Sequence, residues 1–446
     1  METQDRAAAV RGSDGIGDPY FPLDGNGGID VLRYRIHDTY RFGDRHLRGR
    51  TRITLLATQD LKTFNLDFLL PVRRVTVDGR NAGYDQASRH ELVIRPKQHL
   101  RTGERVDVVV RYAGFPERHG YRRERNWLAS DHEVVTMNEP HMAPWWFPAN
   151  DHPLDKALVD IHITVPRGKQ VVANGRLMSR KVLGDAATHH WRADEPMVPY
   201  LAFFAAGRFE ISRGTHEGRP WLVAVSRRLA PAIRQDQMRL MKRTPQIVAW
   251  LETRLGDYPF GQTGGLVTSL QPGFALENQT RPTYQPTSLS TVVHELAHQW
   301  FGDSVAVHGW RDIWLNEGFA TFMEKAYAEA HGGRDAQQWL ESTWEAFGAS
   351  DPFWKLAIGD PGRDNIFAWP VYVRGAMTLQ ALRHRIGETG FWTILRTWAA
   401  DREGGNGTTG EFHALAELVS GEDLDAFFQA WLFDGSRPAH TAGNGL

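Results

Sequence analysis

The chain has 446 residues, of which 41% are hydrophobic and 24% charged, and this length predicts two domains of a globular protein. It contains no cysteine, which excludes disulfides and cysteine-ligated zinc. The formal net charge of -1 gives no electrostatic reason to expect nucleic acid or an anionic membrane as a partner, and no apolar run approaches the roughly 20 residues of a membrane span.

The N-terminal half has the pattern of a β domain. Residues 1–28 are rich in Gly and Asp, which predicts a mobile N-terminal segment. Beyond it, Asp78 and Gly79 predict a hairpin turn, and short strand-like runs are divided by turns, as at 51–57, 75–77, 106–112 and 158–165. We therefore predict an antiparallel β-sandwich or saddle over residues 29–212.

The C-terminal half, residues 213–446, is predicted to be rich in helices. Apolar residues recur there every three or four positions, as at Val248, Leu251 and Leu255, and Pro245 is expected to kink or restart the first helix. The predicted helical runs are 230–255, 288–301, 312–331, 334–347, 371–387, 409–419 and 423–433, and the predicted strands are 221–225 and 265–270. The expected fold class is α+β with two domains.

The N-terminus lacks the 7–15-residue apolar core of a signal peptide. The chain as written is therefore expected in the cytoplasm. A chain from which a leader had been removed would read the same, and that protein would be secreted.

Residues 291–320 carry the strongest chemical signal. His294 and His298 lie four residues apart in a segment without Gly or Pro, so on a helix both imidazoles share one face about one turn apart. Two imidazoles with the neighbouring carboxylate of Glu295 are the parts of a zinc hydrolase site. A catalytic zinc usually takes three protein ligands, and Glu317, which opens the next helical run, supplies the third.

These residues resemble the zinc signature of the aminopeptidase N family of metallopeptidases, the gluzincins that include aminopeptidase N and leukotriene A hydrolase. The resemblance rests on HELAH at 294–298, HQWFG at 298–302 and WLNEGFA at 314–320, and it extends over nearly the whole chain. It implies a thermolysin-like catalytic domain with one zinc ion per chain. Larger relatives continue into a helical C-terminal domain that this sequence lacks, which predicts a more open cleft.

Two residues are expected to act on the substrate beside the metal. Glu295 cannot ligate from its position without distorting the helix, so we expect it to take a proton from water and deliver it to the leaving amine. The resemblance assigns the oxyanion-stabilising hydroxyl to Tyr372, in VYVRGA at 371–376. Glu324, seven residues after Glu317 and on nearly the same helix face, is expected to orient a zinc ligand.

The resemblance also implies residues that grip the free amino group of a peptide. The family run Gly-x-Met-Glu-Asn is FALEN here at 274–278, so Glu277 and Asn278 persist while the Gly and Met do not. A second family run, Thr-Gln-x-Glu, is TMNE at 136–139, which makes Glu139 the second candidate for amine binding. The departures leave the shape of the pocket for the first residue open.

The leading interpretation is a zinc aminopeptidase acting on peptides with a free N-terminus. A thermolysin-type endopeptidase and a non-catalytic peptide-binding relative are the alternatives. Glu277 argues against the first alternative, and the intact ligands, Glu295 and Tyr372 argue against the second. Epoxide hydrolysis, known in one branch of the family, has no positive support in the sequence, and the oligomeric state is left open.

Overall fold

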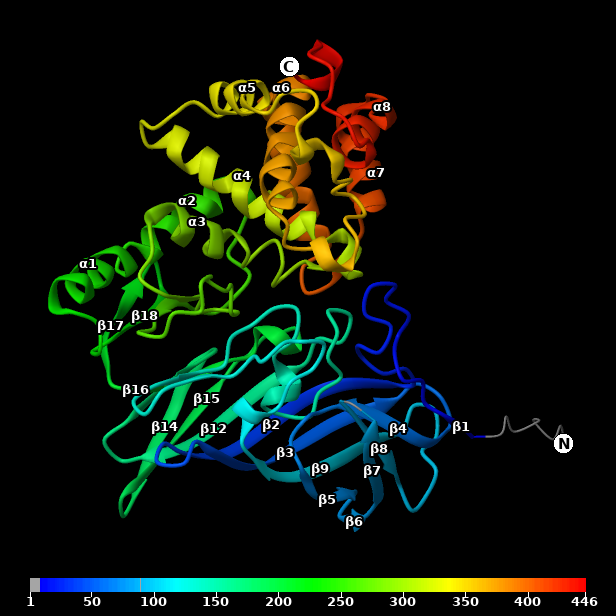
Figure 1. Ribbon diagram of the computed structural model, residues 1–446, viewed down its shortest axis with the longest axis vertical. Helices are drawn as coiled ribbons and strands as arrows, with labels where there is room; N and C mark the ends of the chain where they lie inside the picture. The colour runs from blue at the N-terminus through cyan, green and yellow to red at the C-terminus, as the bar shows by residue number, and fades with distance from the viewer. Residues whose placement is uncertain (1–8, 89) are drawn as a thin grey trace, which may run out of the picture. The chain divides into compact units, whose positions relative to one another are not determined.

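The computed structural model describes residues 9–88 and 90–446, and the chain divides into two compact units. The first unit comprises Met1–Asp18, Pro22–Met238 and Gly261–Pro286. The second comprises Pro19–Phe21, Arg239–Phe260 and Thr287–Leu446. The first unit is built from strands and the second mainly from helices (Figure 1), as the predicted α+β class requires.

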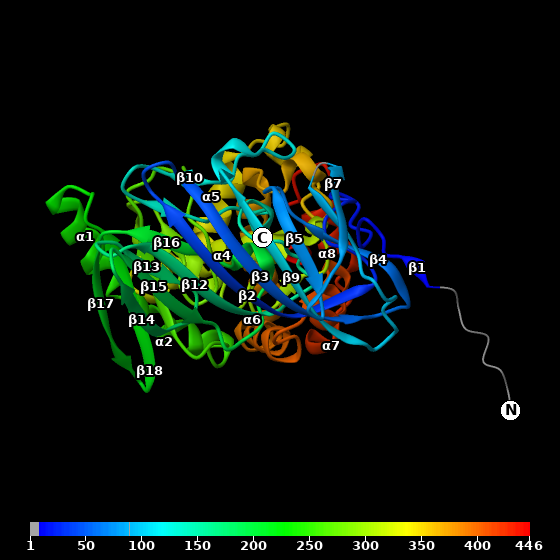
Figure 2. The ribbon, with the colours of Figure 1, turned by 90° about the horizontal axis from the view of Figure 1, so that it is seen from below.

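An eight-stranded sheet forms the largest element of the first unit (Figure 2). In spatial order its strands are β14 (Arg176–Leu183), β15 (Ala186–Arg192), β12 (Leu158–Pro166), β2 (Ile29–Arg41), β3 (His46–Ala57), β9 (Arg105–Gly114), β5 (Val72–Val77) and β6 (Arg80–Asn81). The predicted strand-like runs at 51–57, 75–77, 106–112 and 158–165 all lie in this sheet. The predicted turn at Asp78 and Gly79 joins β5 to β6.

The β2–β12 pair is parallel, unlike the other pairs of this sheet and unlike the predicted antiparallel arrangement. More than a hundred residues separate the end of β2 from the start of β12, so the chain can return to the sheet in the same direction. Along β2, Tyr34, Ile36 and Tyr40 are buried while Arg35 and Arg41 are exposed. This alternation gives the sheet one apolar face that forms the core of the unit.

Three four-stranded sheets complete the first unit. In spatial order they are β1 (Val10–Arg11), β4 (Leu61–Asp67), β8 (Glu91–Arg95) and β7 (Gly83–Ser88); β10 (Leu128–Ala129), β11 (Val134–Val135), β16 (Phe204–Gly207) and β13 (Gln170–Ala173); and β17 (Phe209–His216), β18 (Arg219–Ser226), β19 (Thr263–Val267) and β20 (Thr283–Tyr284). The strands predicted at 221–225 and 265–270 correspond to β18 and β19, the second shifted toward the N-terminus. The predicted boundary at 212–213 falls inside β17.

The N-terminal segment, residues 1–28, was expected to be mobile, but it is packed from residue 10 onward. Strand β1 pairs with β4, and the side chains of Asp24 and Asn26 are buried. The backbone N–H of Asn26 donates a hydrogen bond to the side chain of Asn150. Residues 1–8 of that prediction lie outside the described residues.

Helices build the second unit (Figure 1). They are α2 (Thr244–Leu255), α3 (Leu289–Ala297), α4 (Trp314–Ala330), α5 (Ala336–Ala346), α6 (Trp369–Asp401), α7 (Thr409–Ser420) and α8 (Asp425–Phe428), with a π-helical turn at Gln429–Phe433. Helix α1 (Pro231–Met241) precedes them, and β21 (Ala306–Val307) pairs with β22 (Asn406–Gly407). None of the helices within the described residues is long and apolar enough to cross a membrane.

The helical run predicted at 230–255 restarts as expected, with Pro245 as the second residue of α2, so that prediction is confirmed.

Three other helix predictions need correction. Helix α3 ends at Ala297 rather than at 301, because the chain turns at residues 298–300. Helical structure continues beyond 387 to Asp401, interrupted only by Gly387 with φ 79°. The run at 423–433 divides into α8 and the π-helical turn.

Helices α4 and α6 cross at two glycines. A Cβ atom on Gly318 would lie 2.9 Å from the Cα of Gly375, which is closer than packed atoms tolerate. Gly318 follows Glu317 directly, and Gly375 lies three residues after Tyr372. The close approach therefore brings a predicted zinc ligand and a predicted catalytic residue to the same helix crossing.

Candidate active site and metal centre

Helix α3 sets the spacing of the first two candidate ligands. The side chain of Ser288 caps its N-terminus by accepting a hydrogen bond from the backbone N–H of Thr291. His298 is the C-cap residue, but it keeps helical dihedral angles, and its N–H donates to the carbonyl of His294 at 3.2 Å. The two histidines therefore stand one turn apart although the helix is shorter than predicted.

Glu317, in the first turn of α4, meets both imidazoles. Its Oε2 atom lies 3.2 Å from His294 Nε2 and 3.4 Å from His298 Nε2. Each of the three residues contributes a donor atom to a set in which all atoms lie within 4.8 Å of one another. We call His294, His298 and Glu317 the helical cluster.

The outer nitrogens of both imidazoles are held by acceptors. His294 Nδ1 lies 2.9 Å from Glu324 Oε1, and His298 Nδ1 lies 2.9 Å from the carbonyl oxygen of Phe301. Since these acceptors take the Nδ1–H, each Nε2 faces the carboxylate of Glu317, and the neutral imidazole in this tautomer would offer its Nε2 lone pair to a metal there. Gly302, with φ 132°, leaves room for this arrangement, because a Cβ there would lie 3.3 Å from His298 Nδ1.

The charges of the cluster favour a cation. Burial lowers the pKa of His294, but hydrogen bonds to Glu317 and Glu324 outweigh it and hold that pKa well above its usual value. Burial raises the pKa of Glu317, but the charge of His298 and the hydrogen bond from His294 lower it to about 2. The carboxylates of Glu317 and Glu324 thus favour positive charge at the point where the three donors meet.

The donor set fits zinc. Two neutral imidazole Nε2 atoms and one carboxylate oxygen, each imidazole oriented by an acceptor behind it, are the ligands of a catalytic zinc site that keeps a further position for water. Glu324, the residue expected to orient a ligand, lies behind His294 and contacts its Nδ1. Its carboxylate accepts a second hydrogen bond from Ser290.

The two residues expected to act on the substrate lie beside the helical cluster. Glu295 is buried on α3, and its charge contributes to the raised pKa of His294. The ring of Tyr372, on α6, stacks on that of His294 with centroids 6.1 Å apart and planes inclined by 21°. Glu295 and Tyr372, both predicted from the sequence to act on the substrate, are therefore neighbours of His294 in the second unit.

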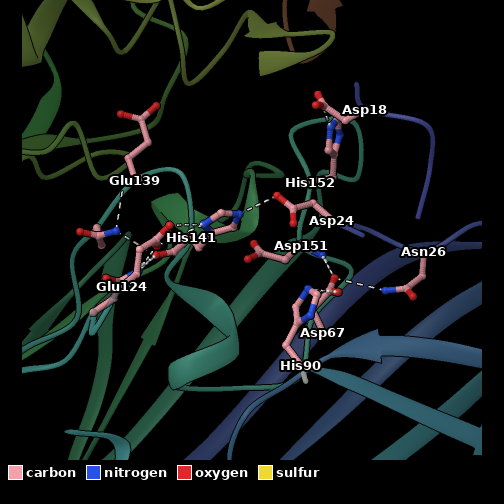
Figure 3. Close-up of polar contacts among 12 residues, drawn as sticks. Asp18, Asp24, Asn26, Asp67, His90, Glu124, Glu139, His141, Asp151 and His152 are labelled. Carbon is pink, nitrogen blue, oxygen red and sulfur yellow. Dashed lines mark hydrogen bonds and ion pairs between the residues drawn. The ribbon is translucent and has the colours of Figure 1, made fainter. Parts of the chain in front are cut away.

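The candidates for amine binding belong to the first unit. Glu277 is buried, and its Oε1 accepts a hydrogen bond of 2.7 Å from the hydroxyl of Tyr200. The side-chain amide of Asn278 donates to the carbonyl of Leu201 at 3.1 Å. Glu139 is half-buried, and its carboxylate points away from the neighbouring His141 (Figure 3).

Sequence reasoning missed Tyr200. The short 3₁₀ segment Pro199–Leu201 carries no motif, and Tyr200 lies 77 residues before the glutamate that it contacts. Only the folded chain brings the two together, so no spacing rule could have found the pair.

The fold and the donor set together are those of the zinc metallopeptidase class. Residues 262–431 match the family model described as the peptidase family M1 domain, and residues 33–201 match the peptidase M1 N-terminal domain. The chain belongs to the M1 family of peptidases.

Relatives agree with this assignment. The chain is 28% identical over 320 residues to aminopeptidase M1-D of Oryza sativa subsp. japonica, covering 67% of this chain and 36% of the relative. It is 27% identical over 348 residues to aminopeptidase N of Lactococcus lactis subsp. lactis, covering 69% and 39%. The chain thus spans about two fifths of the length of these curated relatives.

A solved structure matches over the full length. A mutant M1 zinc metallopeptidase of Deinococcus radiodurans, bound to the substrate Tyr-Ser-Ala, superposes with a TM-score of 0.87 at 26% identity. The match covers 97% of this chain and 100% of that one.

Proposed function

We propose that this chain is a zinc-dependent aminopeptidase that hydrolyses the first peptide bond of peptides with a free N-terminus. The observation that carries the proposal is the convergence of His294 Nε2, His298 Nε2 and Glu317 Oε2 beside the buried carboxylate of Glu295. Membership of the M1 family and the tripeptide bound to the Deinococcus radiodurans enzyme support a peptide as the substrate.

Zinc held by the helical cluster would supply Lewis acidity that activates water and polarises the scissile carbonyl. Glu295 is not one of the three donors, and its place beside His294 suits a general base. Its carboxylate takes the proton of the attacking water and passes it to the leaving amine. Burial of Glu295 keeps this transfer away from bulk solvent.

Tyr372 stabilises the negative charge that develops on the carbonyl oxygen. Its ring packs on His294, so its position relative to the ligands is fixed by contact with one of them. A hydroxyl placed there can donate a hydrogen bond to the developing oxyanion, and that bond is stronger in the transition state than in the ground state.

Glu277 anchors the α-ammonium group of the substrate, with Asn278 and Glu139 as further candidates for the same function. A buried carboxylate can bind an ammonium, since a buried ammonium needs an anionic partner. The hydroxyl of Tyr200 holds Oε1 of Glu277 and orients the carboxylate.

The test compares one peptide with and without an N-acetyl group, using wild type, Glu277→Ala, Tyr200→Phe and the exposed control Glu341→Ala. We expect wild type and the control to cleave only the free peptide. Loss of Glu277 should reduce kcat/KM by the equivalent of about 2–5 kcal/mol, and Tyr200→Phe by less. Equal cleavage of both peptides by wild type would make the protein an endopeptidase. Binding of the peptide without turnover would make it a non-catalytic relative.

A further inference from the structure

A second group of buried metal-ligating side chains lies in the first unit, away from any motif in the sequence. Asp67, His90 and Glu91 each offer one donor atom, and these atoms lie within 4.8 Å of one another. We call these three residues the β cluster. Asp24 and Asp151, also buried, are their acidic neighbours (Figure 3).

The register of two strands creates the β cluster. Asp67 ends β4 and pairs directly with Glu91, which begins β8. Residues opposite each other on antiparallel strands have Cβ atoms about 4.5–5.5 Å apart, and like charges in such pairs are destabilising. The ring of His90 is fixed by stacking on Tyr121, with centroids 4.0 Å apart, and its Nε2 lies 3.3 Å from Asp67 Oδ1.

Protein hydrogen bonds leave much of this acidic group unsatisfied. Oδ2 of Asp67 accepts from the backbone N–H of Asp151 at 2.7 Å and from the Asn26 amide at 3.2 Å. Asn65 is a polar neighbour that favours the charged form of Glu91. Several oxygens nonetheless are fully buried without a hydrogen bond of normal geometry: Asp67 Oδ1, both carboxylate oxygens of Glu91, Asp151 Oδ2, Asp24 Oδ1 and Asn26 Oδ1. Buried polar atoms are rarely left in this state, and here the orphaned oxygens gather in one region.

Few positive charges balance the group. His141 lies 2.6 Å from Asp24 and 3.0 Å from Glu124. Its charge also acts on Asp151, and the charge of Arg11 acts on Glu91. Among the described residues, the ion pair of Asp67 is with His90, and no Lys or Arg forms one with Asp67, Glu91 or Asp151. Buried carboxylates that outnumber the positive charges around them must gain either protons or a cation. In agreement, burial raises the pKa of Asp151 to about 8, and burial with repulsion from Asp14 raises that of Glu91 to about 8.

We propose that Asp67, His90 and Glu91 bind a divalent transition-metal ion, zinc or manganese, that stabilises the β-rich unit. Mixed imidazole and carboxylate donors suit these ions better than calcium, which prefers a shell of oxygens. Asp151, whose backbone N–H donates to Asp67 Oδ2, is a further buried carboxylate that could complete the shell. The proposal is independent of the peptidase activity, because none of these residues belongs to the helical cluster.

A third group of potential ligands, His413, Glu417 and Asp425, provides a matched control. It is partly open to water, and the Asp425 side chain is 82% exposed. Solvated acidic groups need no ion, so this group is expected to bind none.

The experiment measures bound metal by elemental analysis in wild type, His298→Ala, Glu91→Gln, the double variant and Asp425→Asn. We expect two ions per chain in wild type and Asp425→Asn, one in each of His298→Ala and Glu91→Gln, and none in the double variant. Glu91→Gln should keep its peptidase activity, which shows that it is folded. One ion in wild type and none in His298→Ala would overturn the proposal.

Thermal unfolding of His298→Ala gives a second readout that does not depend on activity. A chelator should lower its Tm by at least about 3 °C, and added zinc or manganese should restore it. The Tm of the double variant should respond to neither. An unchanged Tm of His298→Ala after chelation would mean that the β cluster holds protons only. Restoration by calcium alone would refute the proposed class of ion.

Discussion

The helical cluster and the β cluster both combine imidazoles with carboxylates at similar burial. The helical cluster has two imidazoles and one carboxylate, and the β cluster has one imidazole and two carboxylates. In the helical cluster one carboxylate faces two imidazoles, and the pKa of Glu317 falls to about 2 despite burial. In the β cluster two carboxylates face one imidazole, and burial together with mutual repulsion raises the pKa of Asp67 well above its usual value. The positive charge of the two imidazoles outweighs burial at Glu317, whereas at Asp67 burial and the neighbouring carboxylates act in the same direction.

The difference extends to the support behind the ligands. Both imidazoles of the helical cluster have an acceptor at Nδ1, which fixes the tautomer that a metal needs. The β cluster is instead assembled by strand register and by the charge of its own carboxylates. We infer that the helical cluster is preorganised for chemistry, whereas the β cluster serves stability.

Removing one ligand should separate the two clusters most sharply. His298→Ala deletes an Nε2 donor and should abolish peptidase activity, because two remaining ligands hold zinc poorly. The exposed His308 provides the control, and His308→Ala should retain full activity. Initial rates on an amino-acid amide substrate measure the effect. Activity above about a tenth of wild type in His298→Ala would refute the ligand assignment.

Each cluster has a tyrosine stacked on its histidine, and the two tyrosines should differ in function. Tyr372→Phe should lower kcat about 10²–10³-fold with little change in KM, the loss typical of one oxyanion donor. Tyr121→Phe, beside His90 at a centroid distance of 4.0 Å, should leave kcat unchanged. Steady-state kinetics of both variants test this contrast. A change in KM alone for Tyr372→Phe would make that residue a binding residue.

The support behind His294 can be removed without touching a ligand. Glu324→Ala deletes the acceptor of the Nδ1–H and should weaken zinc binding about 10–100-fold. Activity should recover when zinc is added in excess, which a merely structural defect would not allow. Titration of the metal-free variant with zinc, followed by activity, measures the shift. An unchanged zinc affinity would contradict the positioning function of Glu324.

The helix crossing that brings Tyr372 to the helical cluster predicts the smallest effect. Gly375→Ala would place a Cβ 2.8 Å from the Cα of Gly318, so we expect a loss of about 1–3 kcal/mol in the free energy of unfolding. Gly390→Ala, on the same helix with no atom closer than 3.8 Å, is the control and should stabilise slightly. Denaturant unfolding compares them. Equal stability of the two variants would mean that the crossing is not tightly packed.

How far the sequence could predict each cluster follows from the distance between its residues along the chain. In the helical cluster His294 and His298 follow helical spacing and Glu317 follows nineteen residues later, so this short stretch of sequence and its surroundings indicated a metal site. The β cluster joins residues 67, 90 and 91, and its acidic neighbours are residues 24 and 151. No local rule connects them, because the register of β4 and β8 is settled only in the folded sheet.

In the fold, too, elements set by local sequence patterns were predicted, whereas those set by contacts between distant residues were missed. Strand alternation and helical periodicity located most elements, and Pro245 marked the restart of α2 correctly. The extension of α6 beyond Gly387 was missed, since a glycine with a following Gly390 resembles a helix end. The packing of residues 10–28 was also missed, because it depends on contacts with β4 and Asn150 rather than on composition.

The most direct test of the account is the zinc content and turnover of Glu295→Gln. The amide has nearly the same shape as the carboxylate but cannot take a proton from water. We predict the same number of bound metal ions and the same Tm as wild type, with kcat reduced about 10²–10⁴-fold. A variant that keeps both its metal and its full turnover would contradict the assignment of Glu295 as the base, and with it the proposed mechanism.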